Sequence, residues 1–164
     1  MPNTPSQAEK DAQLTAAARS TELGDFEGAI TQLKALIGAQ PRHELAIGML
    51  AGVYAQIGMH DRAIEHFREV LAINPDNALA RFQLGLSQLT SAQAAEAIET
   101  WKPALKSRDD FLTRFYSGLA LMQLYQPDEA RPLLREAEKR MPKDHILYPQ
   151  LIELLASLDP PVSS

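Results

Sequence analysis

The chain has 164 residues, of which 45% are hydrophobic and 23% are charged, so one soluble domain with a continuous apolar core is expected. Its formal net charge is −5 and its pI is about 5.4. This charge argues against non-specific binding to nucleic acid, because such binding requires a basic surface. The sequence contains no cysteine, which excludes disulfides and thiolate metal sites.

The N-terminus, residues 1–5, is polar and contains two prolines, and we expect it to be disordered. It has no apolar core of the kind that a secretory signal needs. No apolar run in the sequence approaches the roughly 20 residues that a membrane-spanning helix requires. We therefore expect a cytoplasmic protein without a membrane span.

The first predicted helix begins after Ser6, which has Glu9 three residues later, the spacing of a capping box. It runs to Gly24, because glycine accepts the left-handed conformation that ends many helices. Asp25 then predicts the start of a partner helix, since its carboxylate accepts hydrogen bonds from free helical N–H groups. That helix stops near Pro41.

The stretch 44–77 shows the same organisation most clearly. Its first helix carries apolar residues at the spacing that places them on one face, namely Ile47, Leu50, Ala51 and Tyr54. Gly58 marks the break, and Pro75 stops the second helix. The apolar residues of that second helix are Ala63, Ile64, Phe67, Val70 and Leu71.

Two further helix pairs follow, and a proline lies inside the second helix of each. Pro103 is expected to kink its helix or end it early, because an internal proline costs about 3 kcal/mol. Pro132 lies nearer the start of its helix and should disturb it less. The four helices are predicted over 78–90, 94–107, 111–124 and 127–140.

A last helix is predicted over 145–158, firm from Tyr148 or Pro149 to Leu158. A stacked array of helices leaves one apolar face uncovered at its end, and this helix is interpreted as its cap. Residues 159–164 should be frayed. The buried face of the helix is predicted to consist of Tyr148, Leu151, Ile152 and Leu155.

The pattern repeats at a nearly fixed period along the chain. Ala29, Ala63, Ala97 and Ala130 are separated by 34, 34 and 33 residues. Large residues keep the same offset from these alanines, namely Leu33, Phe67, Trp101 and Leu134. With closing prolines such as Pro75, this pattern resembles the tetratricopeptide repeat family over about residues 10–144. Departures from the family pattern occur at Ser20, Gln88 and Asp109.

The resemblance implies an all-α, right-handed helical-repeat solenoid of about four helix-turn-helix units with a C-terminal capping helix. The predicted domain covers 6–158. Its units are placed at about 10–43, 44–77, 78–110 and 111–144, with the cap at 145–158.

In this family, a second stripe on the first helix of each unit lines a concave groove that holds ligands. Gly48 and Gly52 lie in one helix and together cost about 2 kcal/mol of helix stability relative to alanine. This suggests that the missing side chains leave room for the close approach of another backbone or an apolar side chain. The large apolar residues of the third and fourth units are expected to face solvent as a binding patch. The resulting groove positions are Leu45, Gly48, Gly52, Ala55, Leu79, Phe82, Leu86, Leu89, Leu112, Phe115, Leu119 and Met122.

No catalytic or metal-binding pattern occurs in the sequence. None of the four histidines pairs with another at the i, i+4 spacing of a helical metal site, and we expect His43, His60, His66 and His145 to lie on exposed turns or helix faces. There is no glycine-rich phosphate loop and no nucleophile elbow. We therefore expect no catalytic residues, metal or cofactor.

The sequence predicts a non-catalytic adaptor that binds an apolar peptide or amphipathic helix in the groove. Three alternatives stay open. The first two are that a second copy in a homodimer or the protein's own N-terminus fills the groove, and the third is that its apolar residues pack against neighbouring helices. A small chaperone for secreted or assembling subunits is a further possibility. Partner identity, pathway and oligomeric state are not encoded in these patterns.

Overall fold

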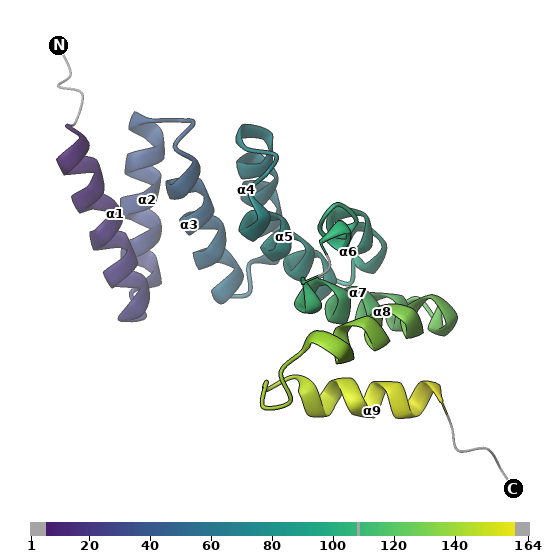
Figure 1. Cartoon of the computed structure of the whole chain (residues 1–164). Coiled ribbons are helices and arrows are strands. Elements are labelled where there is room, and N and C mark those ends of the chain that lie inside the picture. Colours follow the sequence, from purple (N-terminus) through teal and green to yellow (C-terminus); the bar gives the residue numbers. More distant parts are fainter. Residues whose placement is uncertain (1–5, 108, 160–164) are drawn as a thin grey trace, which may run out of the picture. The chain divides into compact units, whose positions relative to one another are not determined.

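The computed structural model describes residues 6–107 and 109–159, and within them all regular secondary structure is helical (Figure 1). It divides into two compact units between Ser87 and Gln88, so the fifth helix contributes to both. The α-helices are α1 (Gln7–Glu22), α2 (Phe26–Ala39), α3 (Glu44–Gln56), α4 (His60–Ile73), α5 (Ala78–Thr90), α6 (Ala94–Trp101), α7 (Phe111–Gln123), α8 (Pro127–Arg140) and α9 (Tyr148–Leu158), with a 3-10 turn η1 (Ala104–Lys106).

The start of α1 confirms the predicted capping box. The backbone N–H of Ser6 donates to Glu9 Oε2 at 2.6 Å, and the Glu9 N–H donates to Ser6 Oγ at 3.3 Å. These bonds satisfy two N–H groups that a helix start otherwise leaves unpaired. The pKa of Glu9 is lowered, chiefly because the backbone N–H of Ser6 donates to its ionised carboxylate. Asp25 caps α2 in turn, accepting from the Gly28 N–H at 2.9 Å.

The N-terminal unit has its core between the first and second helices of each pair. The apolar face predicted for α3 is buried, with Ile47, Leu50, Ala51 and Tyr54 at most 2% exposed. The repeating Ala29 and Ala63 have no exposed surface, so a larger side chain would have no room where the two helices of a pair cross. The repeat therefore reflects a packing requirement.

The helices of a pair also meet at a second repeated contact. In the second repeat Tyr54 stacks on His66, with ring centroids 5.6 Å apart and planes at 7°. At the same position of the third repeat Gln88 replaces tyrosine, and its Oε1 accepts a 2.7 Å hydrogen bond from Thr100. Because Gln88 is only 2% exposed, this hydrogen bond satisfies a group that would otherwise be costly to bury.

In the C-terminal unit, α6 ends at Trp101 and not at Ser107, which confirms the effect expected from Pro103. The chain continues through η1 into an irregular connection. Arg114, only 8% exposed, holds this connection from α7. Its guanidinium donates to the carbonyl oxygens of Leu105, Ser107 and Asp110 at 2.9, 2.6 and 2.9 Å. Pro132, by contrast, lies within an uninterrupted α8.

The last helix, α9, begins at Tyr148 and ends at Leu158, which is the part of the predicted 145–158 helix that was expected to be firm, and it packs on α8. Leu151 and Leu155 are buried, but the prediction that Ile152 is buried is wrong, because its side chain is 38% exposed and Leu158 completes the buried stripe instead. The spacing 151, 155, 158 matches a helix that contacts its neighbour along one narrow face.

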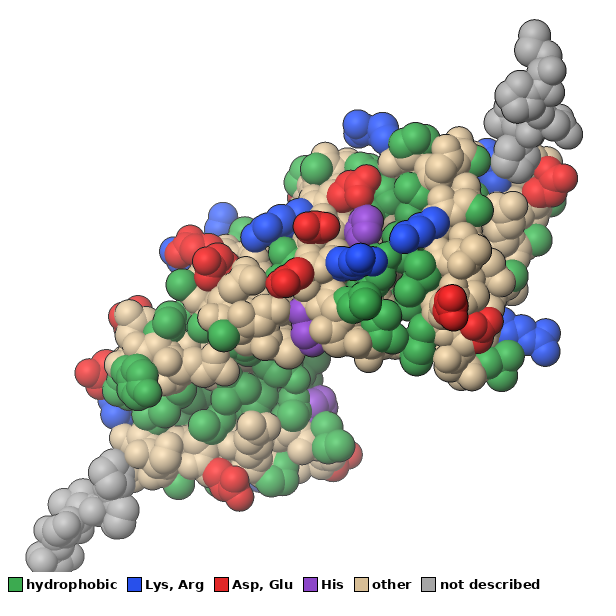
Figure 2. Space-filling view, turned by 180° about the vertical axis from the view of Figure 1, so that it is seen from behind, with side chains coloured by type: hydrophobic (Ala, Val, Ile, Leu, Met, Phe, Trp, Pro, Cys, Tyr) green, Lys and Arg blue, Asp and Glu red, His purple; other side chains and the backbone are tan. Residues whose placement is uncertain are grey.

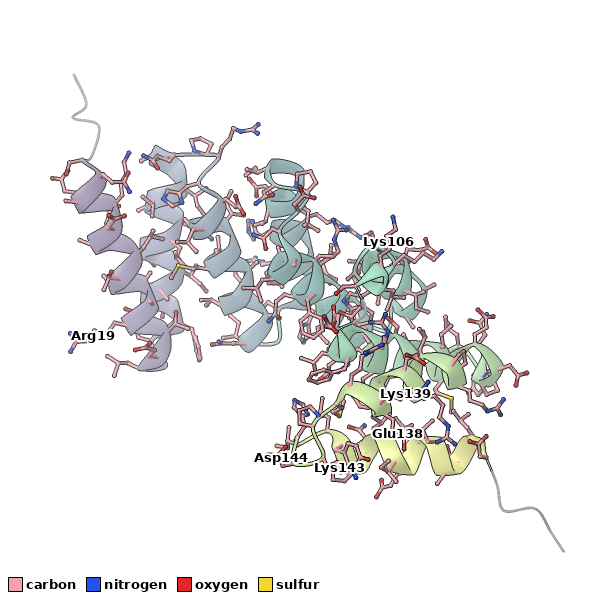
Figure 3. The ribbon with its side chains drawn as sticks, in the orientation of Figure 1. Arg19, Lys106, Glu138, Lys139, Lys143 and Asp144 are labelled. Atoms are coloured by element: carbon pink, nitrogen blue, oxygen red, sulfur yellow. The ribbon has the colours of Figure 1, made fainter. Side chains whose placement is uncertain are left out.

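Asp159, which follows α9, is held by two arginines of α8. Arg131 Nε lies 3.1 Å from Asp159 Oδ1, and Arg135 pairs with Asp159 Oδ2. Arg131 also donates to the Leu158 carbonyl at 2.9 Å, which satisfies an acceptor at the end of the helix. Figure 3 shows the side chains between α8 and α9, including Glu138, which accepts from Arg135 at 3.0 Å.

The predicted disorder of residues 1–5 falls outside the described residues, as does the predicted fraying of residues 159–164 except at Asp159. Among the helices of the described ranges, none has the length and apolar character needed to cross a membrane.

Candidate functional site

The predicted groove positions on α3 lie at the spacing i, i+3, i+7 and i+10, along one side of the helix. Leu45, near its start, is 59% exposed. Gly48, Gly52 and Ala55 are half-buried. This side of α3 is therefore distinct from the buried face that carries Tyr54.

The two glycines of α3 are not required by packing. A Cβ atom at Gly52 would meet no other atom within 4 Å, and one at Gly48 would lie 3.8 Å from Val70 Cγ2, an ordinary contact. Alanine would thus fit at both positions and favour the helix by about 1 kcal/mol each. The stability of the free protein therefore does not explain why glycine occupies these two positions.

The start of α3 is fixed by hydrogen bonds to the connection between α4 and α5. Glu44 Oε1 accepts from Asn77 Nδ2 at 2.7 Å and from Asn74 Nδ2 at 2.9 Å. Both bonds lower the pKa of Glu44, the one from Asn77 more strongly. This carboxylate therefore has a structural role next to the exposed Leu45.

Three groove positions on α5 belong to the N-terminal unit. Leu79 is 69% exposed, whereas Phe82 and Leu86 are half-buried and make further contacts. Ala80 and Leu84 of the same helix lie in the core of this unit. Leu79 and Leu45 are thus the two groove leucines of this unit that present most of their surface to solvent.

In the C-terminal unit, Leu89, Leu112, Leu119 and Met122 are half-buried. The expectation that Phe115 faces solvent is wrong: it has no exposed surface. It belongs to the core that α7 shares with α8 and α9, and its ring lies edge-on to Tyr116 with centroids 5.2 Å apart.

Figure 2 shows hydrophobic side chains gathered over a broad area of the C-terminal unit, the part that carries the lower grey tail. The partly buried apolar residues packed against the core of this unit are Ile98, Phe111, Tyr116, Leu119, Met122, Leu133, Leu147, Tyr148 and Leu154.

The four histidines are half-buried rather than exposed. His43 caps α3, its Nδ1 accepting from the Ala46 N–H at 3.3 Å, and His145 lies edge-on to Phe111 at 5.5 Å between centroids. Among the described residues, no three His, Cys, Asp or Glu side chains are grouped so that they could hold a metal ion.

Sequence reasoning missed one exposed aromatic residue, Tyr125, in the turn between α7 and α8. Its side chain is 93% exposed, and its backbone is left-handed at φ 57°. It occupies the repeat position of Gly24 and Gly58, both at φ 77°. Aligning the turns as well as the helices would have identified it.

Comparison with known structures shows the same fold. The structure of MamA has a TM-score of 0.83 at 21% identity, covering 97% of this chain and 84% of MamA. YrrB, described as a TPR protein with an unusual peptide-binding site, has a TM-score of 0.72 at 16% identity, covering 91% of this chain and 86% of YrrB. These likenesses establish an all-α helical-repeat fold of the solenoid class.

A relative in sequence is cellulose synthase operon protein C of Pseudomonas fluorescens (strain SBW25), 29% identical over 127 residues. The match covers 71% of this chain but only 9% of that protein.

Two family models, both described as tetratricopeptide repeat, match residues 22–78 and 58–122, which together make up more than half of the chain. Proteins of this kind are generally non-catalytic modules that bind peptides or other proteins. The repeated small residues, the paired helices and these matches agree, and the chain belongs to the tetratricopeptide repeat family.

Proposed function

We propose that this protein is a non-catalytic adaptor whose N-terminal unit binds an apolar or amphipathic segment of a partner protein along α3. The observation that carries the proposal is the pair Gly48 and Gly52. Both positions have room for a methyl group in the free protein, yet neither has one. A ligand that packs closely against α3 would account for their absence.

The exposed leucines support the same proposal. Leu45 and Leu79 keep 59% and 69% of their surface exposed and can bury it against a ligand. Burying one leucine side chain contributes roughly 2 kcal/mol, so two such anchors and a close backbone approach suit a short segment with a few apolar side chains. That YrrB has a peptide-binding site on a similar fold is consistent with this role.

The partner can be identified by a photo-crosslinking amino acid placed at Leu79 in cells that produce the protein. The matched control carries the crosslinker at Glu65, an exposed residue of α4 in the same unit. We expect a partner segment to be trapped from position 79 and not from position 65. Equal trapping from both positions would contradict the proposal.

A synthetic peptide of the trapped segment then tests the role of the glycines. Gly52→Ala should stabilise the free protein and weaken peptide binding, because the added methyl group fills the space that the ligand needs. Leu79→Glu should weaken binding without loss of helical circular dichroism. If Gly52→Ala left the affinity unchanged, the glycines would not belong to the binding surface.

Self-association through the same surface is the main alternative. Light scattering over a range of protein concentrations distinguishes the two, since a dimer that Leu79→Glu dissociates would assign the surface to a second copy. Phe115, which is wholly buried, is unsuitable for this test because a charge there would disrupt the core. A chaperone role and a cytoplasmic location stay predictions from the sequence.

A further inference from the structure

The first helices of three successive repeats are capped at the same position by side chains of different chemistry. Asn77 Oδ1 and Asp110 Oδ1 each accept, at 2.8 Å, from the backbone N–H three residues later, at the starts of α5 and α7. At the start of α3 the acceptor is His43 Nδ1, which lies 3.3 Å from the backbone nitrogen of Ala46. The three caps are separated by 34 and 33 residues, which is the period of the repeat.

Of these three acceptors, only the imidazole changes its protonation near neutral pH. Nδ1 accepts from a backbone N–H only while it carries no proton, so this cap requires a neutral ring with its proton on Nε2. Asparagine does not titrate, and carboxylates in general stay ionised above about pH 5, whereas histidine side chains in general change charge between about pH 5 and about pH 8. Protonated His43 would direct a donor at the Ala46 N–H and would place a positive charge at the helix N-terminus, where the dipole disfavours it.

The surroundings of His43 are compatible with protonation of its ring. The residue is half-buried, so solvent reaches part of it. The adjacent carboxylate, Glu44, is already engaged by Asn77 and Asn74. Further charged residues at this end of the N-terminal unit are Glu9, Lys10, Arg42, Glu69, Asp76 and Arg81. Because these residues carry both signs, the loss of the hydrogen bond to Ala46 should dominate the effect of protonation.

We propose that His43 is a pH-sensitive cap, which holds the start of α3 in neutral solution and releases it when the imidazole is protonated. The stabilisation by this cap is present above the pH range in which histidine titrates, and it is lost as the pH falls through that range. Leu45, the exposed leucine of the groove, belongs to the first turn that is released. An effect on ligand binding rests on the proposed function, whereas the release of α3 does not and is tested on the free protein.

The test is amide hydrogen exchange of the free full-length chain at about pH 7.5 and about pH 5.5, with each rate divided by that of an unstructured chain at the same pH. In the wild type, we expect the protection of the Ala46 and Ile47 amides to fall about fivefold between the two pH values, the effect of losing one helix cap. In His43→Asn, which has the capping residue of the third repeat, protection should be the same at both. His43→Ala should show low protection at both.

His145→Asn is the matched control. His145 Nδ1 also accepts from a backbone N–H, that of Leu147 at 3.2 Å, but it lies before α9 in the C-terminal unit. This variant should therefore keep the pH response of α3. An equal response in the wild type and in His43→Asn would overturn the proposal, because another histidine or a global loosening would then be responsible. Loss of the response in His145→Asn would overturn it as well.

Discussion

Gly118, in the middle of α7, provides a sharp test of the packing described here. It is buried, and a Cβ atom placed on it would lie 2.5 Å from Leu134 Cδ2 and 2.6 Å from Leu134 Cγ. Leu134 has no exposed surface, so its side chain cannot simply swing aside. Gly118→Ala therefore forces α7 and α8 apart, whereas Gly52→Ala places the same methyl group in open space.

The two substitutions should have opposite signs. Alanine favours a helix over glycine by about 1 kcal/mol. Overpacking a well-filled core costs typically 1–3 kcal/mol, and a contact this short calls for the upper end of that range. We expect Gly118→Ala to destabilise the C-terminal unit by about 2 kcal/mol net, and Gly52→Ala to stabilise the N-terminal unit by about 1 kcal/mol.

Trp101, the single tryptophan, is fully buried in the C-terminal unit and reports its unfolding by fluorescence. With a urea dependence of about 1 kcal/mol per molar, Gly118→Ala should lower the midpoint of the Trp101 transition by roughly 2 M. Circular dichroism should show a raised midpoint for Gly52→Ala. A Gly118→Ala variant as stable as wild type would show that α7 and α8 are packed less tightly than the contacts with Leu134 imply.

Three further substitutions test individual contacts. Arg114→Ala removes three hydrogen bonds to carbonyl oxygens and should destabilise the C-terminal unit by about 3 kcal/mol, as measured by Trp101 fluorescence, while Arg114→Lys restores only part of this loss. Because the pKa of Glu44 is lowered in the folded state, its ionised carboxylate stabilises the N-terminal unit above the ordinary glutamate pKa of about 4.5, and this stability is lost as the pH falls through the folded-state pKa. Glu44→Gln should therefore make the stability of the unit, measured by urea denaturation, less dependent on pH below about 4.5. Asp159→Ala removes the ion pairs with two half-exposed arginines, and we expect the local stability of α9 to fall by less than about 1 kcal/mol. This loss should be seen as faster amide exchange in α9, with an unchanged midpoint of global urea unfolding.

Much of the fold was predictable because its determinants are local. Small residues such as Ala29 and Ala63 recur at a fixed period because they lie where the two helices of a pair cross. These crossing positions can be predicted from the repeat alone, without the rest of the chain. Pro103 ends α6 early because proline lacks the N–H group that the helix needs. The bounds of α9 follow equally from Pro149 and the apolar spacing after it.

What was not predictable depends on how elements meet in space. Phe115 and Phe82 occupy the same repeat position, so helical spacing places them on equivalent sides of their two helices. Only the packing of α8 and α9 decides that Phe115 is buried. Ile152 was placed in the buried stripe because it is apolar, although the narrow contact with α8 uses Leu158. Arg114 carries no signal in the sequence, since its partners are backbone carbonyls of a segment that does not form a regular helix. The groove positions themselves stay a prediction, which the binding experiments test.

The contacts between Arg114 and the segment after Pro103 also bear on how this repeat can change by mutation. While Pro103 is present, one guanidinium group donates to the carbonyl oxygens of both Leu105 and Ser107, so losing the arginine alone should be destabilising. If Pro103 were replaced by alanine and α6 extended, Leu105 and Ser107 would lie in the last turn of a helix, whose free carbonyl oxygens are commonly satisfied by water, and Arg114 would be less strictly required. The two positions should therefore show strong epistasis, and the order in which they are substituted would decide whether the intermediate folds.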